Sequence, residues 1–188
     1  MKLGILGGTF DPIHLGHLII AQEAISSLGL DRVLFVPAGD PWMKAATTIA
    51  PRQHRLAMVV AAVGDNQKFK VSPSELERFG PSYTVETLEE FREDYGPQTE
   101  LFFIIGADAL KDFGKWHEPE RVLELCMLAV VGRPSHEALD LSPLETILPG
   151  IGERVALVDD VAIGVSATDI RGRVAEGRSI KYLVPPIV

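Results

Sequence analysis

Short, almost continuously apolar runs alternate with amphipathic segments along most of the 188 residues. The apolar runs have the length of buried strands, which we predict at Leu3–Leu6, Arg32–Pro37, Lys68–Ser72, Leu101–Gly106 and Met127–Val131. The segments between them have helical spacing, and we expect helices at Leu18–Leu28, Pro51–Val63, Thr84–Tyr95 and Glu120–Leu125. Strands that alternate with helices are typical of a parallel sheet. The pattern therefore predicts an α/β fold, a Rossmann-like doubly wound parallel sheet with helices on both faces.

One domain spanning residues 1–188 accommodates this pattern. A chain of this length buries a substantial core, and 46% of its residues are hydrophobic. The segment Leu139–Glu153 is rich in proline and glycine and is the least regular part. We expect it to be an excursion on the surface rather than a boundary between domains.

Charge and cysteine content narrow the classes of partner. The formal net charge of −8 argues against nucleic acid as the main partner, because a phosphate backbone needs a basic surface. No apolar run approaches membrane-spanning length, and the first residues predict a strand rather than a signal peptide. The single cysteine, Cys126, lies in an apolar run and is expected to be buried. We expect a cytoplasmic protein with neither a membrane nor a nucleic acid as partner.

The turn after the first predicted strand carries the most specific chemistry. Gly7, Gly8 and Thr9 follow the strand, and His14 and His17 lie at the start of the next helix. Backbone N–H groups at such a turn point outward unpaired, and the helix dipole favours an anion there. A His-x-x-His pair can also bind a metal, but the three other histidines and Cys126 form no recognisable ligand cluster. The arrangement predicts a phosphate site with two imidazoles.

Ligands of open parallel sheets bind beyond the carboxyl ends of the strands. This rule directs attention to Pro37–Lys44, to Gly106 and Asp108, and to Arg133. The chain has neither the G-x-x-x-x-G-K-[ST] phosphate loop nor a G-x-G-x-x-G after a strand. A phosphate-loop NTPase and a nicotinamide-dependent dehydrogenase are therefore disfavoured.

A second constellation lies near the other end of the sequence, in Ser166-Ala167-Thr168-Asp169-Ile170-Arg171. Ser166 followed by Asp169 is typical of an ordinary helix start. The same geometry offers free amides, two hydroxyls and the Arg171 guanidinium to phosphate oxygens. The two interpretations stay open on local sequence alone.

The first motif resembles the G-G-[TS]-F-D-P-x-H-x-G-H signature of the nucleotidyltransferase superfamily. The rest of the chain is similar to its nicotinate mononucleotide adenylyltransferase branch. The segments that carry this resemblance lie in family order at residues 80–88, 103–110, 115–116, 132–134 and 165–171. The chain differs from the family pattern at Pro41-Trp42-Met43-Lys44, where members often have Pro-Pro-His-Lys, and it stops at Val188, where members commonly continue with another short helix.

The resemblance implies transfer of the adenylyl group of ATP to nicotinate mononucleotide, with release of pyrophosphate. It implies catalytic roles for His14, His17, Lys44 and Arg171. The implied ATP-binding residues are Gly7, Gly8, Thr9, His14, His17, Gly106, Asp108, Arg133, Ser166, Thr168 and Arg171. The implied nicotinate mononucleotide-binding residues are Gly8, Thr9, Phe10, Lys44, Tyr83, Thr84, Trp116 and His117. Mg²⁺ is expected to bridge the ATP phosphates mainly through substrate oxygens and water, without a protein metal site.

Three alternatives stay open. Another acceptor of the same superfamily, such as nicotinamide mononucleotide, phosphopantetheine or a phospho-alcohol, gives the same reaction type. A nucleotide-binding sensor without catalysis uses the same donors. A metal hydrolase would use His14 and His17 as ligands. The sequence also leaves a homo-oligomer open.

Overall fold

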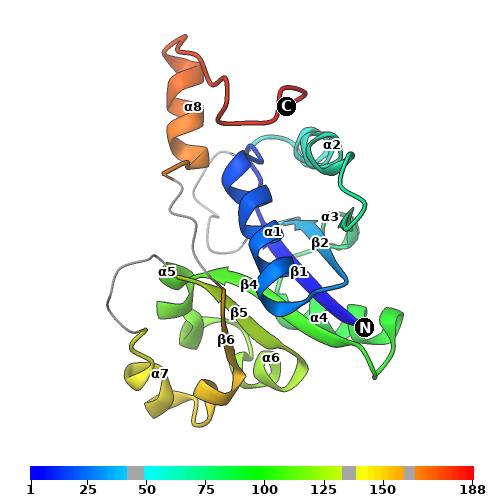
Figure 1. Cartoon of the computed structure of the whole chain (residues 1–188), viewed down its shortest axis with the longest axis vertical. Helices are drawn as coiled ribbons and strands as arrows, with labels where there is room; N and C mark the ends of the chain where they lie inside the picture. Colours follow the sequence, from blue (N-terminus) through cyan, green and yellow to red (C-terminus); the bar gives the residue numbers. More distant parts are fainter. Residues whose placement is uncertain (42–48, 133–138, 159–163) are drawn as a thin grey trace.

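One parallel sheet forms the centre of the computed structural model, which describes residues 1–41, 49–132, 139–158 and 164–188 (Figure 1). The strand order is β3-β2-β1-β4-β5-β6, and every neighbouring pair is parallel. The strands are β1 (Lys2–Gly8), β2 (Arg32–Pro37), β3 (Phe69–Val71), β4 (Glu100–Gly106), β5 (Met127–Val131) and β6 (Val155–Val158). The predicted α/β class and parallel sheet are confirmed.

Helices connect the strands and cover both faces of the sheet (Figure 1). They are α1 (Leu15–Leu28), α2 (Arg52–Val63), α3 (Ser74–Glu77), α4 (Thr84–Tyr95), α5 (Ala107–Lys111), α6 (Pro119–Leu125), α7 (Ser142–Ile147) and α8 (Ala167–Ala175), with the 3-10 turns η2 (Phe113–Lys115) and η3 (Ile151–Arg154). Within the described residues, none of the helices combines the length and the apolar character that a bilayer crossing needs.

Side chains of the central strands point alternately to two cores. In β4, Leu101, Phe103 and Ile105 belong to the core that also contains the apolar residues of α4 and α6. Phe102 and Ile104 belong to the opposite core, beneath α1 and α2. Because both faces are covered, both sets of side chains are apolar, and the strand appears in the sequence as one continuous hydrophobic run.

The segment Leu139–Glu153 is more regular than expected. It contains α7 and the start of η3, and it buries Leu144, Leu148 and Ile151 in the core beside α6. Proline stands in the first turn of α7, where a missing N–H is tolerated, so its presence marks a helix start rather than a break. The expectation of irregular structure is therefore wrong, whereas the expected surface location is confirmed, because most residues of the segment are exposed.

The strand order places the site. Chain connections run in opposite directions from β1, toward β2 on one side and toward β4 on the other. The crevice between the carboxyl ends of β1 and β4 is the topological switch point at which open α/β sheets bind ligands. Gly8 ends β1 and Gly106 ends β4, so both glycines lie at this edge.

Candidate functional site

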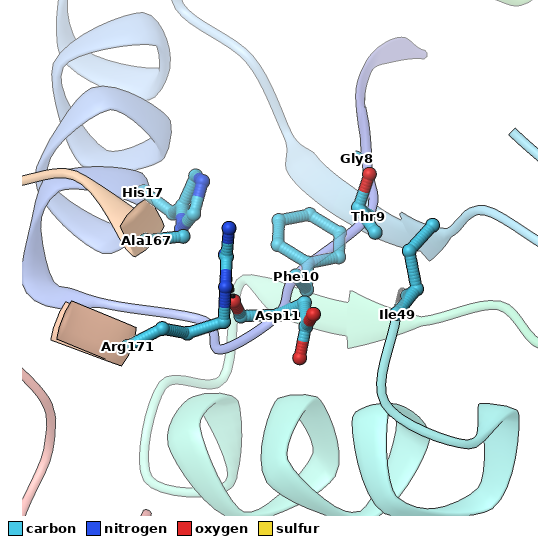
Figure 2. Close-up of a pocket in the computed structure, with 8 residues that line it drawn as sticks. All are labelled: Gly8, Thr9, Phe10, Asp11, His17, Ile49, Ala167 and Arg171. Atoms are coloured by element: carbon cyan, nitrogen blue, oxygen red, sulfur yellow. Dashed lines mark hydrogen bonds between the residues drawn. The ribbon is translucent and has the colours of Figure 1, made fainter. Parts of the chain in front are cut away.

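Two cavities meet at the carboxyl edge of the sheet. The smaller cavity has a volume of about 180 Å³ and lies between the turn after β1, the start of α1 and α8 (Figure 2). It is lined by Gly8, Thr9, Phe10, Asp11, His17, Ile49, Ala167 and Arg171. The larger cavity, of about 420 Å³, is lined by Leu6, Gly7, Gly8, Thr9, His17, Ile20, Ala38, Pro41, Glu75, Ser82, Thr84, Phe103, Ile104, Ile105, Gly106, Ala109 and Trp116. Gly8, Thr9 and His17 belong to both, so the cavities meet at the turn that the sequence singles out.

His14 and His17 come together at the start of α1. The helix begins at Leu15, three residues earlier than predicted, with His14 as its extended N-cap residue. The two imidazole rings stack with their centroids 3.7 Å apart, and the backbone N–H of His14 donates to Nδ1 of His17 at 3.2 Å. Since Nδ1 of His17 accepts, a neutral His17 carries its proton on Nε2. His17 therefore presents a donor nitrogen at the junction of the cavities.

His14 lies behind His17 rather than on the cavity surface. Its residue is 7% exposed, and burial lowers its pKa from 6.5 to about 4. Its Nδ1 has no hydrogen-bond partner among the described residues. Burial thus keeps His14 uncharged at neutral pH, and its ring supports that of His17.

The first backbone amides of α1 are not available in the way the sequence suggests. The N–H of Leu15 donates to the carbonyl of Leu183 at 3.0 Å, and the N–H of His17 donates to the carbonyl of His14 at 3.0 Å. The expectation of outward, unpaired amides is therefore wrong at these two residues. At Leu15 the reason is long-range, because the C-terminal segment packs against the helix start and caps it, whereas the bond of His17 is local, to a residue three positions earlier. Side-chain donors take on the larger share of any anion binding.

Helix α8 forms the far wall of the smaller cavity. Nη1 of Arg171 donates to the carbonyl of Asp11 at 2.7 Å, and Nη2 lies 3.5 Å from Oγ1 of Thr168. Figure 2 shows Arg171 extending from α8 toward the segment that carries Phe10 and Asp11. The helix-start interpretation also holds, because Oγ of Ser166 accepts the N–H of Asp169 at 3.1 Å. One segment therefore serves as a helix cap and as a wall of the cavity.

Phe10 closes the base of the turn after β1. It is 2% exposed and adopts a left-handed φ of +48°, which is uncommon for a bulky residue. Its ring meets that of His17 edge-on at 4.9 Å. A Cβ at Gly8 would approach this ring to 3.3 Å, so glycine there lets the turn lie against Phe10. Gly8 and Phe10 therefore determine where the His17 ring lies relative to the cavity.

Trp116 and Thr84 both line the larger cavity. The Trp116 ring packs against Phe103 and Phe113, with centroids 5.8 and 5.2 Å away, and its Nε1 is buried without a hydrogen-bond partner among the described residues. The ring is therefore both a neighbour of the core and a wall of the cavity. Tyr83 precedes Thr84 in the sequence. Its ring stacks on that of His117, with the two ring centroids 4.2 Å apart.

Some expected site residues lie elsewhere. Asp108 is not among the residues that line either cavity, and its exposed carboxylate lies 3.3 Å from Nζ of Lys111. His117 and Tyr83 are also outside the lining sets, although Thr84 and Trp116 next to them belong to one. Gly106 lines the larger cavity, and a Cβ there would meet nothing within 4 Å. Lys44 and Arg133 lie outside the described residues.

Sequence reasoning misses several buried polar groups around the cavities. Asp11, Arg55 and Glu75 are each less than 10% exposed. Glu75 accepts a hydrogen bond from Oγ1 of Thr87 at 2.8 Å, and burial raises its pKa above its usual range. Arg55 lies on a predicted helix, where charged residues are usually solvated, and Glu75 lies in a segment with no predicted element, so periodicity gives no signal for either. Only Asp11 could have been noticed from the sequence, because it lies inside the first motif.

The described side chains around the cavities do not form a metal site. In the described ranges, no group of three or more His, Cys, Asp or Glu side chains is placed to hold a metal ion. Near the smaller cavity, the Asp11 carboxylate accepts the N–H of Ala50 at 3.3 Å, and Nδ1 of His17 accepts the N–H of His14. Both acceptor atoms are therefore engaged by backbone N–H groups rather than offered to a metal ion.

Comparison with known proteins adds independent information. The model of the cytidylyltransferase-like family matches residues 5–173. A protein of Roseiflexus sp. named a probable nicotinate-nucleotide adenylyltransferase is 48% identical over 99% of this chain and 92% of its own length. One of Thermomicrobium roseum with the same name is 48% identical over 100% and 86%. The solved structure of the Plasmodium falciparum nicotinic acid mononucleotide adenylyltransferase complexed with NaAD superimposes with a TM-score of 0.75, at 21% identity, covering 98% of this chain and 91% of that one.

Proposed function

The chain belongs to the cytidylyltransferase-like family, and from this premise we propose that it transfers the adenylyl group of ATP to nicotinate mononucleotide. The products are nicotinate adenine dinucleotide and pyrophosphate, so the reaction is a step of NAD synthesis. The observation that carries the proposal is the pair of cavities that meet at Gly8, Thr9 and His17. Full-length relatives at 48% identity with the corresponding name support it.

In this proposal each cavity holds a different part of the substrates. We place the ATP phosphates in the smaller cavity, between His17 and Arg171, because these residues carry its donor side chains. The larger cavity takes the two nucleosides. ATP fits on the side of Gly106, where the absence of a side chain leaves room, and nicotinate mononucleotide fits on the side of Thr84 and Trp116.

The reaction needs no protein nucleophile. A phosphate oxygen of nicotinate mononucleotide attacks the α-phosphorus of ATP, and the bond to the bridging oxygen of pyrophosphate breaks on the opposite side. The work of the protein is therefore alignment of the substrates and stabilisation of the charge that moves onto the leaving group. His17 donates from Nε2 to a phosphate oxygen, and Arg171 neutralises the leaving phosphates. Lys44, Ser166 and Thr168 complete this role in the proposal.

Mg²⁺ belongs to the proposal as a partner of ATP. When bound, it would supply positive charge that offsets the charge of the ATP phosphates. The smaller cavity fits this mode, because His17 and Arg171 offer N–H groups to the phosphates, which would leave the metal to substrate oxygens and water. The cytoplasmic location stays a prediction and the homo-oligomer stays open, and light scattering of the purified protein tests the second.

The acceptor is tested by pyrophosphate release with nicotinate mononucleotide and nicotinamide mononucleotide at matched concentrations. We expect the acid to give the higher kcat/KM. Equal or faster turnover of the amide would overturn the choice of acceptor while leaving adenylyl transfer intact. Turnover of neither compound, with tight binding of ATP, would instead favour a nucleotide-binding sensor.

A further inference from the structure

Arg55, in the first turn of α2, is a buried side chain that joins three backbone segments beside the cavities. It is 1% exposed. Nη1 donates to the carbonyl of Thr9 at 2.7 Å, Nε to that of Ala50 at 3.0 Å, and Nη2 to that of Gly39 at 3.5 Å. Thr9 follows β1, Gly39 follows β2, and Ala50 leads into α2. One guanidinium therefore holds together the segments from which the turn between the cavities is built.

Asp11 completes the arrangement from the other side. Its carboxylate accepts the N–H of Ala50 at 3.3 Å, while Arg55 binds the carbonyl of the same residue. Ala50 is thus held at both of its backbone groups by two buried charged side chains. Burial lowers the pKa of Arg55, the Asp11 charge raises it and the Arg52 charge lowers it, and a guanidinium stays protonated throughout.

The bonded segments supply the walls of both cavities. Thr9 lines both of them, and Asp11 and Ile49, the neighbour of Ala50, line the smaller one. Arg55 itself lines neither. A buried guanidinium is costly unless its donors are satisfied. The three bonds of Arg55 leave from three nitrogens, whereas lysine carries all its donors on one nitrogen and cannot replace the planar fork. A change at Arg55 therefore shifts the turn without removing any group that touches a ligand.

We propose that Arg55 is a positioning residue of the transfer reaction, which fixes Thr9 and Ala50 so that the two substrates meet in line at the turn between the cavities. The inference rests on the proposed function, because this turn matters for rate only if two substrates meet there. Misplacement by about 1 Å can cost about a hundredfold in rate. The loss is expected in kcat, since the groups that bind the nucleotides remain.

The experiment compares Arg55→Lys and Arg55→Gln with Arg92→Lys and Arg92→Gln. Arg92 is a matched control because it also donates to three backbone carbonyls, those of Thr99, Pro97 and Leu125, and lines neither cavity. Thermal unfolding of each variant sets an assay temperature at which it is folded. We then expect kcat of Arg55→Lys to fall about 10- to 100-fold. Both KM values should change by less than about threefold, and the Arg92 variants should keep kcat within about twofold of the parent.

The outcomes separate the two proposals. A parent protein that does not turn over nicotinate mononucleotide contradicts the proposed function, whatever the variants do. With an active parent, an Arg55 variant that keeps kcat within about twofold, or loses no more than its Arg92 counterpart, overturns the inference. Failure of both Arg55 variants to fold also overturns it, because Arg55 would then serve the fold rather than the reaction geometry.

Discussion

The guanidinium of Arg171 donates a hydrogen bond to the carbonyl oxygen of Asp11 at 2.7 Å, across 160 positions of sequence. This contact joins α8 to the turn after β1, so the smaller cavity is built from the two ends of the chain (Figure 2). It also holds the guanidinium at the cavity before any phosphate arrives. Part of the entropy that the Arg171 side chain would lose on binding an anion is therefore already lost when the protein folds.

Arg171→Lys should show how much of the site depends on this geometry. Lysine keeps the charge but cannot bond the Asp11 carbonyl and a phosphate through one planar fork. We expect kcat/KM for ATP to fall about 10- to 100-fold, the equivalent of one or two charge-assisted hydrogen bonds. Steady-state kinetics of Arg173→Lys provide the control, because Arg173 lies on the same helix and pairs with Asp169 instead. Similar losses in both variants would contradict the role of Arg171.

The variant His17→Asn distinguishes the role of Nδ1 of His17 from that of Nε2. Asparagine can still accept the N–H of His14, as Nδ1 of His17 does, so α1 should start as before. It cannot place a donor where Nε2 lies. We expect kcat to fall about 10²- to 10³-fold while ATP binding, measured by calorimetry, weakens less than about tenfold. His54→Asn on the exposed face of α2 is the control, and near-parent activity of His17→Asn would refute the assigned role.

Much of the fold can be predicted from the sequence because its strands are buried on both faces. The runs at β2, β4 and β5 and the helix at α4 appear as uninterrupted apolar or periodic segments, and their predicted limits agree with the structure to within one residue. Strand β6 gives no such signal, since Leu157 on this edge strand is 64% exposed and only Val158 is buried. Edge strands lack the continuous run that identifies central ones.

The site is predictable only where one local segment carries its chemistry. The turn at Gly8 and the pair His14 and His17 follow from adjacent residues, and the structure brings Arg171 to them. The bond from Leu15 to Leu183 and the contacts of Arg55 depend on segments far apart in sequence. Such contacts follow from the packed fold, and residue spacing carries no trace of them.

Stability should decrease in mild acid because of His14. Its pKa is about 4 in the folded protein and near 6.5 when unfolded, so between these values the unfolded state binds more protons. The free energy of unfolding should therefore fall as pH is lowered through this window, by about 2 kcal/mol from His14 between pH 7 and pH 5. Urea unfolding of His14→Asn at both pH values isolates this part from that of Glu75, whose raised pKa acts in the opposite direction. Equal pH dependence in parent and variant would contradict the assignment.

Ser82 should affect one substrate and spare the other. Its Oγ accepts the N–H groups of Gly39 and Asp40 at 3.0 and 3.1 Å, and its hydroxyl bonds to Glu75. Ser82 therefore links the segment after β2 to the wall of the larger cavity, which Thr84 also lines.

Ser82→Ala leaves two amides without their acceptor and releases that wall of the larger cavity. In the proposed arrangement the ATP phosphates occupy the smaller cavity, which Ser82 does not line. We therefore expect KM for nicotinate mononucleotide to rise about tenfold, while KM for ATP stays within about twofold. Initial rates over a grid of both substrates measure the two constants together. Ser26→Ala, which removes an exposed hydroxyl bonded to Gln22, is the matched control. A rise in KM for ATP equal to that for the acceptor would show that Ser82 shapes the whole crevice and not the acceptor wall alone.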